Sequence, residues 1–146
     1  MKKYKQTFIP SVSTVGFSSE PKFVKNYYAK HLQGKTVINK HLNIPIHFTG
    51  KSGRKIAFGG YKYIKKAAIL QCLQQLLEVA EFNNFGNRKA NDGLTVLGYL
   101  NFKAKIKIDN KIENVRIAVS LRKDGKVYYS HEVNYIRTKV ASSRSR

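Results

Sequence analysis

The sequence predicts an α+β domain in which N-terminal helices pack on one face of a twisted antiparallel sheet that ends in a three-stranded meander. Three observations support this fold class. Apolar residues recur at helical spacing in two stretches, apolar and polar residues alternate over much of the segment 100–133, and turn signals divide that segment into strands. A length of 146 residues and an apolar content of 42% fit one domain with its own core.

Two helices are expected in the first 80 residues. Residues 1–20 are rich in Ser and Thr, and we interpret them as a flexible N-terminal arm. A first helix should begin at Pro21, with Ser19 as a candidate N-cap, and end at Gly34. A longer helix is expected over residues 64–80, because its apolar side chains form one stripe.

Extended structure is expected between the helices, and a loop after the second one. Residues 44–48 and 54–58 should pair as a hairpin across a Gly-containing turn. Pro45 favours an edge strand, since proline cannot donate a hydrogen bond to a neighbouring strand. Residues 82–93 are polar and rich in Asn, which indicates a long loop.

The meander is expected between Leu100 and Val133. Its turns should lie at residues 109–111 and 122–125, and the second turn carries an Asp-Gly pair typical of hairpins. A single domain is therefore expected over residues 21–137, followed by a disordered basic tail, residues 138–146.

Charge is the most unusual property of the composition. The chain has 28 Lys and Arg against 8 Asp and Glu, a formal net charge of +20 at pH 7. No acidic residue occurs between Glu20 and Glu78. A compact domain with this much charge of one sign repels itself, and a polyanion such as nucleic acid relieves that repulsion. Nucleic acid is therefore the expected partner.

One face of the meander should be polar and open. The strand alternation places four basic residues on it, about 7 Å apart along a strand, which resembles the spacing of phosphates in a nucleic-acid backbone. These residues are Lys103, Lys105, Lys107 and Arg116. A solvated strand face would show the same pattern, and the total charge favours phosphate binding.

Several enzyme classes lack support in the sequence. There is no HExxH, CxxC or nucleophile-elbow motif and no phosphate loop, and the few carboxylates argue against a metal site, so no metal or cofactor is expected. The single cysteine, Cys72, lies in an apolar stretch and should be a buried, inert thiol. No apolar run is long enough to span a membrane, and the first ten residues lack the apolar segment of an export signal.

Histidine and tyrosine residues gather near the predicted strands. Metal-free RNA cleavage uses such groups, since it needs a base for the 2′-hydroxyl, an acid for the 5′-oxygen and cations to stabilise the phosphorane. The candidate catalytic residues are His47, His131, Tyr128, Tyr129 and Arg116. The candidate phosphate-binding residues are Lys51, Arg54, Lys55, Tyr99, Lys103 and Lys105.

The histidines also allow structural interpretations. His131 is in phase with Tyr129 and Val133, which would place it on the covered face as a core histidine unless a bulge changes the phase. Tyr128 would then lie on the open face. His47 precedes Phe48 and could be a histidine at the solvent edge of its strand.

Several segments resemble nuclease domains of the barnase/EndoU/colicin/RelE (BECR-fold) group, most closely those of polymorphic toxins and phage polyvalent proteins. These segments are Thr36–Lys40, Ile44–Phe48, Gly53–Lys55, Ala67–Ala80, Leu100–Ala104 and Gly125–His131. The resemblance covers roughly residues 36–137. Where related phage domains carry a His-Tyr-aromatic run, this chain has Gly98-Tyr99-Leu100.

This resemblance implies a microbial-ribonuclease-like fold and a metal-independent endoribonuclease. Toxins of this kind, including those of contact-dependent growth inhibition, often cleave transfer RNA and leave a 2′,3′-cyclic phosphate. They are secreted or delivered as part of a larger protein, act in the cytoplasm of a target cell, in some cases with a host factor, and are neutralised by an acidic immunity protein. The alternative is a non-catalytic nucleic-acid-binding module, such as a phage accessory or ribosome-associated protein, in which tyrosines stack on bases.

Overall fold

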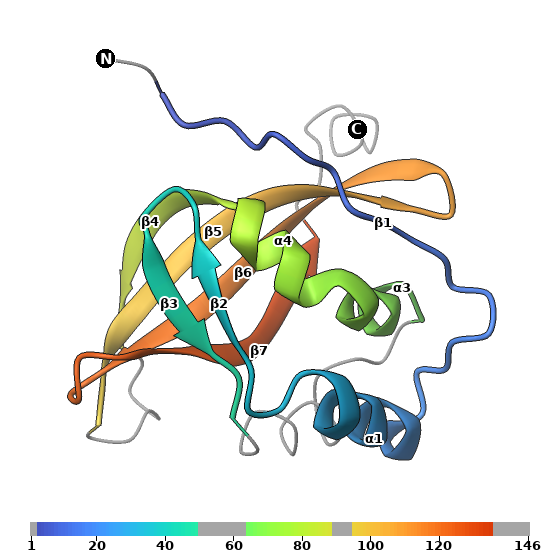
Figure 1. Ribbon diagram of the computed structural model, residues 1–146, viewed down its shortest axis with the longest axis horizontal. Helices are drawn as coiled ribbons and strands as arrows, with labels where there is room; N and C mark the ends of the chain where they lie inside the picture. Colours follow the sequence, from blue (N-terminus) through green and yellow to red (C-terminus); the bar gives the residue numbers. More distant parts are fainter. Residues whose placement is uncertain (1–2, 50–63, 89–94, 136–146) are drawn as a thin grey trace, which may run out of the picture.

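The computed structural model describes residues 3–49, 64–88 and 95–135, with the backbone alone from residue 130 onward. It shows an α+β domain, as predicted, built on a curled seven-stranded sheet (Figure 1). The sheet was expected to be antiparallel, and this part of the prediction is wrong: the sheet is mixed, because two of its pairings, between segments distant in sequence, are parallel. The strand order is β1-β5-β6-β7-β3-β2, and β4 pairs with β5 beside this path. The helical elements are α1 (Pro21–His31), α3 (Ile64–Ala68), η2 (Ile69–Cys72) and α4 (Leu73–Val79). The strands are β1 (Ser11–Val12), β2 (Thr36–Asn39), β3 (Ile44–His47), β4 (Glu81–Asn87), β5 (Val96–Ile108), β6 (Lys111–Arg122) and β7 (Val127–Tyr135).

The first helix forms where the sequence predicts it. Pro21 opens α1, and the chain leaves it before Gly34, whose φ of 86° favours glycine. The N-cap residue is Glu20 instead of Ser19, and no side chain caps the helix. Val24 and Tyr28 turn inward, and the Tyr28 hydroxyl donates to the Thr49 carbonyl at 2.7 Å.

The second predicted helix is interrupted. A 3₁₀ turn, η2, separates α3 from α4, and Cys72 leaves the helical region with φ −132° and ψ 15°. The apolar stripe nevertheless faces the sheet, since Leu73, Leu76 and Leu77 are fully buried. Cys72 is buried as expected, and burial raises the pKa of its thiol to about 12.

The three-stranded meander forms as predicted. β5, β6 and β7 pair antiparallel in sequence order. Asp109 and Asn110 both have positive φ, 49° and 70°, which defines a two-residue hairpin turn of the type that follows the twist of the strands. Gly125, with φ 82°, takes the left-handed position of the second turn.

The core lies between one face of the sheet and the helices α3 and α4. The inward side chains of the strands are Phe102, Ala104, Ile106, Ile108, Val115, Ile117, Val119, Val127, Tyr129, Ile46, Phe48 and Val37. Along most of each strand they alternate with the side chains of the opposite face, which are largely polar. On that opposite face Ala118 and Ser120 of β6 are nevertheless buried.

Residues 82–93 were expected to form a loop, and this prediction is wrong for residues 82–87. They belong to β4, which pairs antiparallel with β5. Asn and Gly have low strand propensity, but an edge strand needs only backbone pairing and tolerates exposed polar side chains. Phe85 packs on Gly98, where an added Cβ would collide with the Phe85 ring and would lie 2.7 Å from the Gly86 carbonyl oxygen. Residues 89–93 lie outside the described residues.

Strand β3 has different partners from those predicted. Its neighbours are β2, which is antiparallel, and β7, which is parallel. The predicted return strand, residues 54–58, lies outside the described residues. β3 is therefore an internal strand, and Pro45 is tolerated because pairing with β7 covers only Ile46 and His47.

A buried asparagine joins β2 to the end of α4. Asn39 is fully buried, and its amide group donates to the Leu77 and Ala80 carbonyls at 2.7 and 3.0 Å. Its carbonyl oxygen accepts from the Leu42 amide at 2.9 Å. Asn39 thus satisfies the carbonyls that a helix C-terminus leaves without partners.

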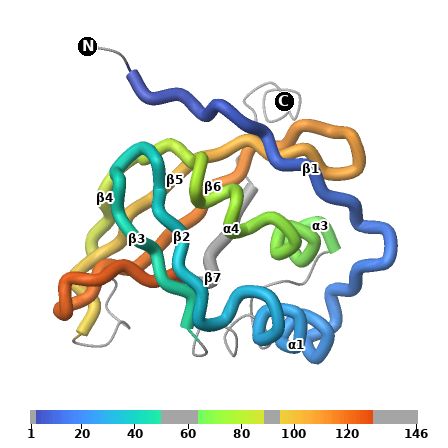
Figure 2. Tube along the Cα trace, in the orientation of Figure 1, coloured from blue at the N-terminus to red at the C-terminus, as the bar shows by residue number. Residues whose placement is uncertain are grey.

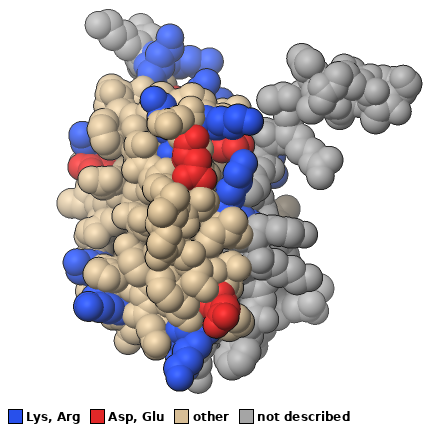
Figure 3. All heavy atoms as spheres, turned by 90° about the vertical axis from the view of Figure 1, so that its right-hand side faces the viewer, with Lys and Arg blue, Asp and Glu red and all other residues tan. Residues whose placement is uncertain are grey.

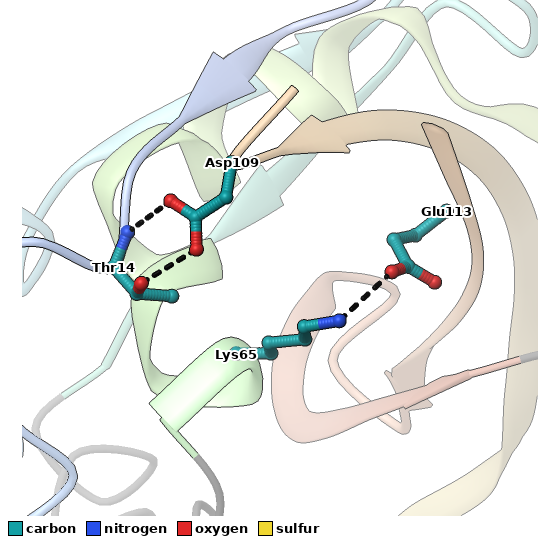
Figure 4. Close-up of polar contacts among 4 residues, drawn as sticks. All are labelled: Thr14, Lys65, Asp109 and Glu113. Atoms are coloured by element: carbon teal, nitrogen blue, oxygen red, sulfur yellow. Dashed lines mark hydrogen bonds and ion pairs between the residues drawn. The ribbon is translucent and has the colours of Figure 1, made fainter. Parts of the chain in front are cut away.

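The N-terminal segment, expected to be a flexible arm, runs along the sheet and then down the side of the molecule, past α3, to the start of α1 (Figure 2). The Gln6 side chain bonds both backbone groups of Lys105, at 2.7 and 2.8 Å. β1 pairs in parallel with the end of β5. Asp109 accepts hydrogen bonds from the amide and the hydroxyl of Thr14, and the nearby Lys65 pairs with Glu113 (Figure 4). The predicted tail, residues 138–146, lies outside the described residues.

Candidate nucleic-acid interface

The face of the sheet turned away from the core, here called the open face, carries the basic side chains of the meander. Lys103 lies opposite Arg116, and Lys105 lies opposite Asn114. Lys103, Lys105 and Arg116 are exposed. We call Lys103, Lys105, Lys107 and Arg116 the basic row. By contrast, the side of the molecule on the right of Figure 1 has a broad uncharged area between scattered charges of both signs (Figure 3).

His47 and Tyr128 are neighbours on this face. They are opposite each other in the parallel pairing of β3 and β7, and their ring centroids are 5.7 Å apart. On the other side of His47, the Thr36 hydroxyl lies 2.9 Å from the Nδ1 atom. Both rings are half-buried, so one side of each remains accessible.

Tyr128 is held by the turn that follows β6. Its hydroxyl donates to Asp124 Oδ2 at 2.5 Å, and the Arg122 guanidinium lies 4.7 Å from the centre of its ring. The hydrogen bond to Asp124 raises the pKa of the Tyr128 phenol above its ordinary value. The same bond, assisted by the Lys126 amide, lowers the pKa of the Asp124 carboxyl. The phenol therefore stays protonated and the carboxylate stays charged near neutral pH.

We call Thr36, His47, Tyr128, Arg122 and Asp124 the His47 cluster. Three of its members, Thr36, His47 and Tyr128, belong to one row of side-chain positions that crosses six strands. In register, this row contains Thr36, His47, Tyr128, Ser120, Tyr99 and Gly86. Arg116 is four residues from Ser120 along β6, so the basic row begins about 13 Å along the strand from Ser120, which is the cross-strand neighbour of Tyr128.

The remaining predicted site residues lie elsewhere or outside the described part of the chain. Tyr129 is fully buried against Phe48, with ring centroids 5.5 Å apart, so it faces the core and cannot meet a substrate on the open face. His131 follows it in β7, where two residues lie between the partners of Val119 and Ala118, so the bulge considered above is present in the backbone. Its side chain is outside the described part, and so are Lys51, Arg54 and Lys55.

Three members of the His47 cluster were not predicted. Thr36 reaches the site through the pairing of β2 with β3, and Arg122 and Asp124 reach it from the end of β6 and the turn into β7. The alternation around Tyr128 could indicate that Arg122 and Tyr128 share a face, but no local pattern indicates a parallel pairing between segments about 80 residues apart.

Among the described residues, no group of three or more His, Cys, Asp or Glu side chains is placed to hold a metal ion. No helix in the described ranges has the length and apolar character needed to cross a bilayer.

The fold and the site define a small, basic α+β domain whose curled sheet exposes a polar face with an imidazole, a phenol and several cations. The chain belongs to the large polyvalent protein-associated domain 3 family, whose model matches residues 21–129. The match includes the whole His47 cluster and ends before His131. No match was found among curated proteins or among solved structures.

Proposed function

We propose that the chain is a metal-independent endoribonuclease, with transfer RNA as the expected substrate. The observation that carries this proposal is the His47 cluster, which combines an imidazole, a phenol and a guanidinium on the face that also holds the basic row. These groups supply what phosphodiester transesterification needs, namely proton transfer and positive charge near the phosphate. The net charge of +20 supports a polyanionic substrate.

His47 is the proposed base. In this role its Nδ1–H donates to Thr36 Oγ1, which leaves a lone pair on Nε2. Nε2 takes the proton of a ribose 2′-hydroxyl while that oxygen attacks the adjacent phosphorus. The bond from phosphorus to the 5′-oxygen breaks, and the 5′-oxygen takes a proton. The products are a 2′,3′-cyclic phosphate and a free 5′-hydroxyl.

The proton for the 5′-oxygen is assigned, from the sequence, to His131, or to Tyr128 once its hydroxyl has turned from Asp124 to the 5′-oxygen. In the described geometry that proton is donated to Asp124, and the raised pKa makes the phenol a weaker acid. Tyr128 cannot be the base, because its bond to Asp124 favours the protonated phenol. Arg122 lies against the same ring and is the proposed cation for the phosphorane. Arg116, predicted as catalytic, is about 13 Å along the strand and fits better as a ligand of a neighbouring phosphate, together with Lys103.

The biological setting is part of the proposal. Membership of a polyvalent-protein-associated family supports a domain that works within a larger protein. We extend this to a toxin domain that is delivered into a target cell and acts on RNA in its cytoplasm. An acidic immunity protein would block it by covering the open face, because opposite charge favours that contact.

A non-catalytic nucleic-acid-binding module is the second candidate. One observation favours it: the described part of the open face contains one histidine, His47, whereas transesterification uses two proton-transfer groups. In such a module the basic row would bind phosphates, and Tyr99 and Tyr128 would stack on bases.

The test is to incubate the full chain with total RNA in EDTA and to examine the ends of the products. Discrete fragments with 2′,3′-cyclic ends are expected. His47→Asn should lower the cleavage rate by about 100-fold or more, while RNA binding in a gel shift is retained. His31→Asn is the matched control, since His31 is exposed at the end of α1. Intact RNA that is still bound would favour the non-catalytic module, and a fully active His47→Asn variant would exclude His47 as the base.

A further inference from the structure

We propose that His41 is a pH-dependent clamp that holds the N-terminal segment on the sheet and releases part of it in mild acid. The part that is released, residues 3–10, is here called the N-terminal strap. Residues 11–14 stay attached to the sheet. The clamp controls how one edge of β5 is covered, and it does not depend on the proposed function.

His41 lies in the turn between β2 and β3, beside the end of α4 (Figure 1). Its Nδ1 atom accepts a hydrogen bond from the Phe82 amide, at the start of β4, over 2.8 Å. A backbone N–H can only donate, so Nδ1 must carry a lone pair. The geometry therefore requires a neutral imidazole that has its proton on Nε2.

The His41 ring also supports the beginning of the strap. Tyr4 stacks on it, with ring centroids 4.5 Å apart and an interplanar angle of 8°. The Tyr4 hydroxyl donates to the Val79 carbonyl at 2.8 Å, which fixes the other end of the phenol. The two rings are parallel only while His41 keeps the orientation set by its bond to Phe82. A rotation of the imidazole would therefore remove the surface on which Tyr4 rests.

The strap covers the edge of β5 beyond the point where its pairing with β4 ends, at Lys103. Gln6 Oε1 accepts from the Lys105 amide at 2.7 Å, and Gln6 Nε2 donates to the Lys105 carbonyl at 2.8 Å. Further along, the Pro10 carbonyl accepts from the Lys107 amide at 2.8 Å. Unpaired backbone groups at a sheet edge are a template for other extended chains. Release of the strap would expose such groups beside the basic row.

A proton on Nδ1 is incompatible with the bond to Phe82. It would replace the lone pair by an N–H that points at another N–H, so the ring must turn. Burial, and then the charges of Glu81 and Glu78, raise the pKa of the Tyr4 phenol, which places both carboxylates near the stacked rings. An imidazolium finds a better partner in a carboxylate than in a backbone amide. Lys40, in the same turn, is 3.9 Å from Glu78.

The second anchor of the N-terminal segment should persist in mild acid. The amide and the hydroxyl of Thr14 donate to the two carboxylate oxygens of Asp109, at 2.9 and 2.6 Å. These hydrogen bonds lower the pKa of the Asp109 carboxyl group, which therefore stays charged at pH 5. β1 pairs with β5 through its backbone, and that pairing has no titrating group. Acid should free residues 3–10 and leave residues 11–14 in place.

The test is amide hydrogen exchange of the full chain, followed by NMR at pH 7.5 and pH 5. Protection factors are compared, because they correct for the intrinsic effect of pH on exchange. Free imidazoles take up a proton over this range, which can shift an opening equilibrium by up to about 30-fold. The protection factors of the Phe82 and Lys105 amides should fall by about fivefold or more at pH 5. That of the Thr14 amide should change by less than about twofold.

His41→Asn is the decisive variant. The asparagine Oδ1 can accept from the Phe82 amide but cannot take up a proton, so protection of Phe82 and Lys105 should no longer depend on pH. In two control variants the fall should persist. Glu81→Gln keeps an acceptor for the Gln6 amide, and His31→Asn removes an exposed histidine at the end of α1.

Three results would overturn the clamp. The first is equal protection at the two pH values in the natural chain. The second is a fall in protection that survives His41→Asn. The third is stronger protection in acid, which would mean that attraction of the imidazolium to the Tyr4 ring outweighs the lost hydrogen bond.

Discussion

The buried amide of Asn39 gives the sharpest stability prediction. Asn39→Ala removes three hydrogen bonds and leaves two carbonyls and one amide without their partner in a buried place. Each unsatisfied group is worth about 1–3 kcal/mol, and relaxation or water entry will recover part of this. We expect the free energy of unfolding to fall by about 3 kcal/mol, which leaves a typical domain folded.

Asn39→Asp replaces the NH₂ group of the side chain by an oxygen. For this variant, the loss in free energy of unfolding should depend on pH. The new carboxylate faces the Leu77 and Ala80 carbonyls, near the negative end of the α4 dipole. The pKa of the introduced carboxyl group should therefore be higher in the folded state than its unfolded value of about 3.9. A group with a raised folded pKa contributes its full stability below the unfolded pKa, and that stability is lost as the pH rises through the folded pKa. Near pH 7 the loss should reach about 3–5 kcal/mol, as for an unpaired buried charge.

The assay is urea denaturation of the natural chain and both variants at pH 3.5 and pH 7. At pH 3.5 the protonated carboxyl group can donate one hydrogen bond and accept another, so Asn39→Asp should be more stable than Asn39→Ala. At pH 7 the order should reverse. Asn26→Asp is the control for added negative charge, since Asn26 is exposed on α1. An order of stability that is the same at both pH values would refute the role given to the buried amide.

Three further predictions concern local contacts. Tyr128→Phe removes the main cause of the lowered Asp124 pKa, so an NMR titration should show that pKa move up toward its ordinary value; no movement would contradict the hydrogen bond. Gly98→Ala should lower the free energy of unfolding by about 1–3 kcal/mol, because the new Cβ meets both a ring and a backbone oxygen. Phe85→Ala in the same chain should restore only part of that loss in a thermal melt. Asn110→Ala should destabilise the β5–β6 turn by about 1 kcal/mol in urea, whereas Asn110→Gly should not, since φ is 70° at this position.

The sequence predicts the elements whose side chains repeat with a clear period. Alternation places Phe102 and Ile106 inside and Lys103 and Lys105 outside, and the structure agrees. Alternation does not predict the strand β4, because Asn84, Gly86 and their neighbours show no alternation of apolar and polar residues. Backbone pairing with β5 holds this strand in place.

The site is less predictable than the fold, because it depends on contacts distant in sequence. His47 and Tyr128 were separate candidates, and their pairing follows from the parallel contact of β3 with β7. The phase of the last strand places Tyr128 on the open face and Tyr129 on the covered face, and the structure agrees, but a bulge that changes the phase could not be located from the sequence. Thr36 has no chemical feature in the sequence that marks it, and its role appears only when β2 lies beside β3.

The short contact between β3 and β7 also has a kinetic consequence. It covers two residue pairs, and it connects the β2–β3 hairpin to the end of a meander that forms largely from neighbouring segments. Contacts across so long a stretch of chain are slow to form, because their loop entropy must be overcome first. The approach of His47 to Tyr128 would therefore report on a late step of folding, and a chain that had not completed this step would contain every residue of the site without having a site.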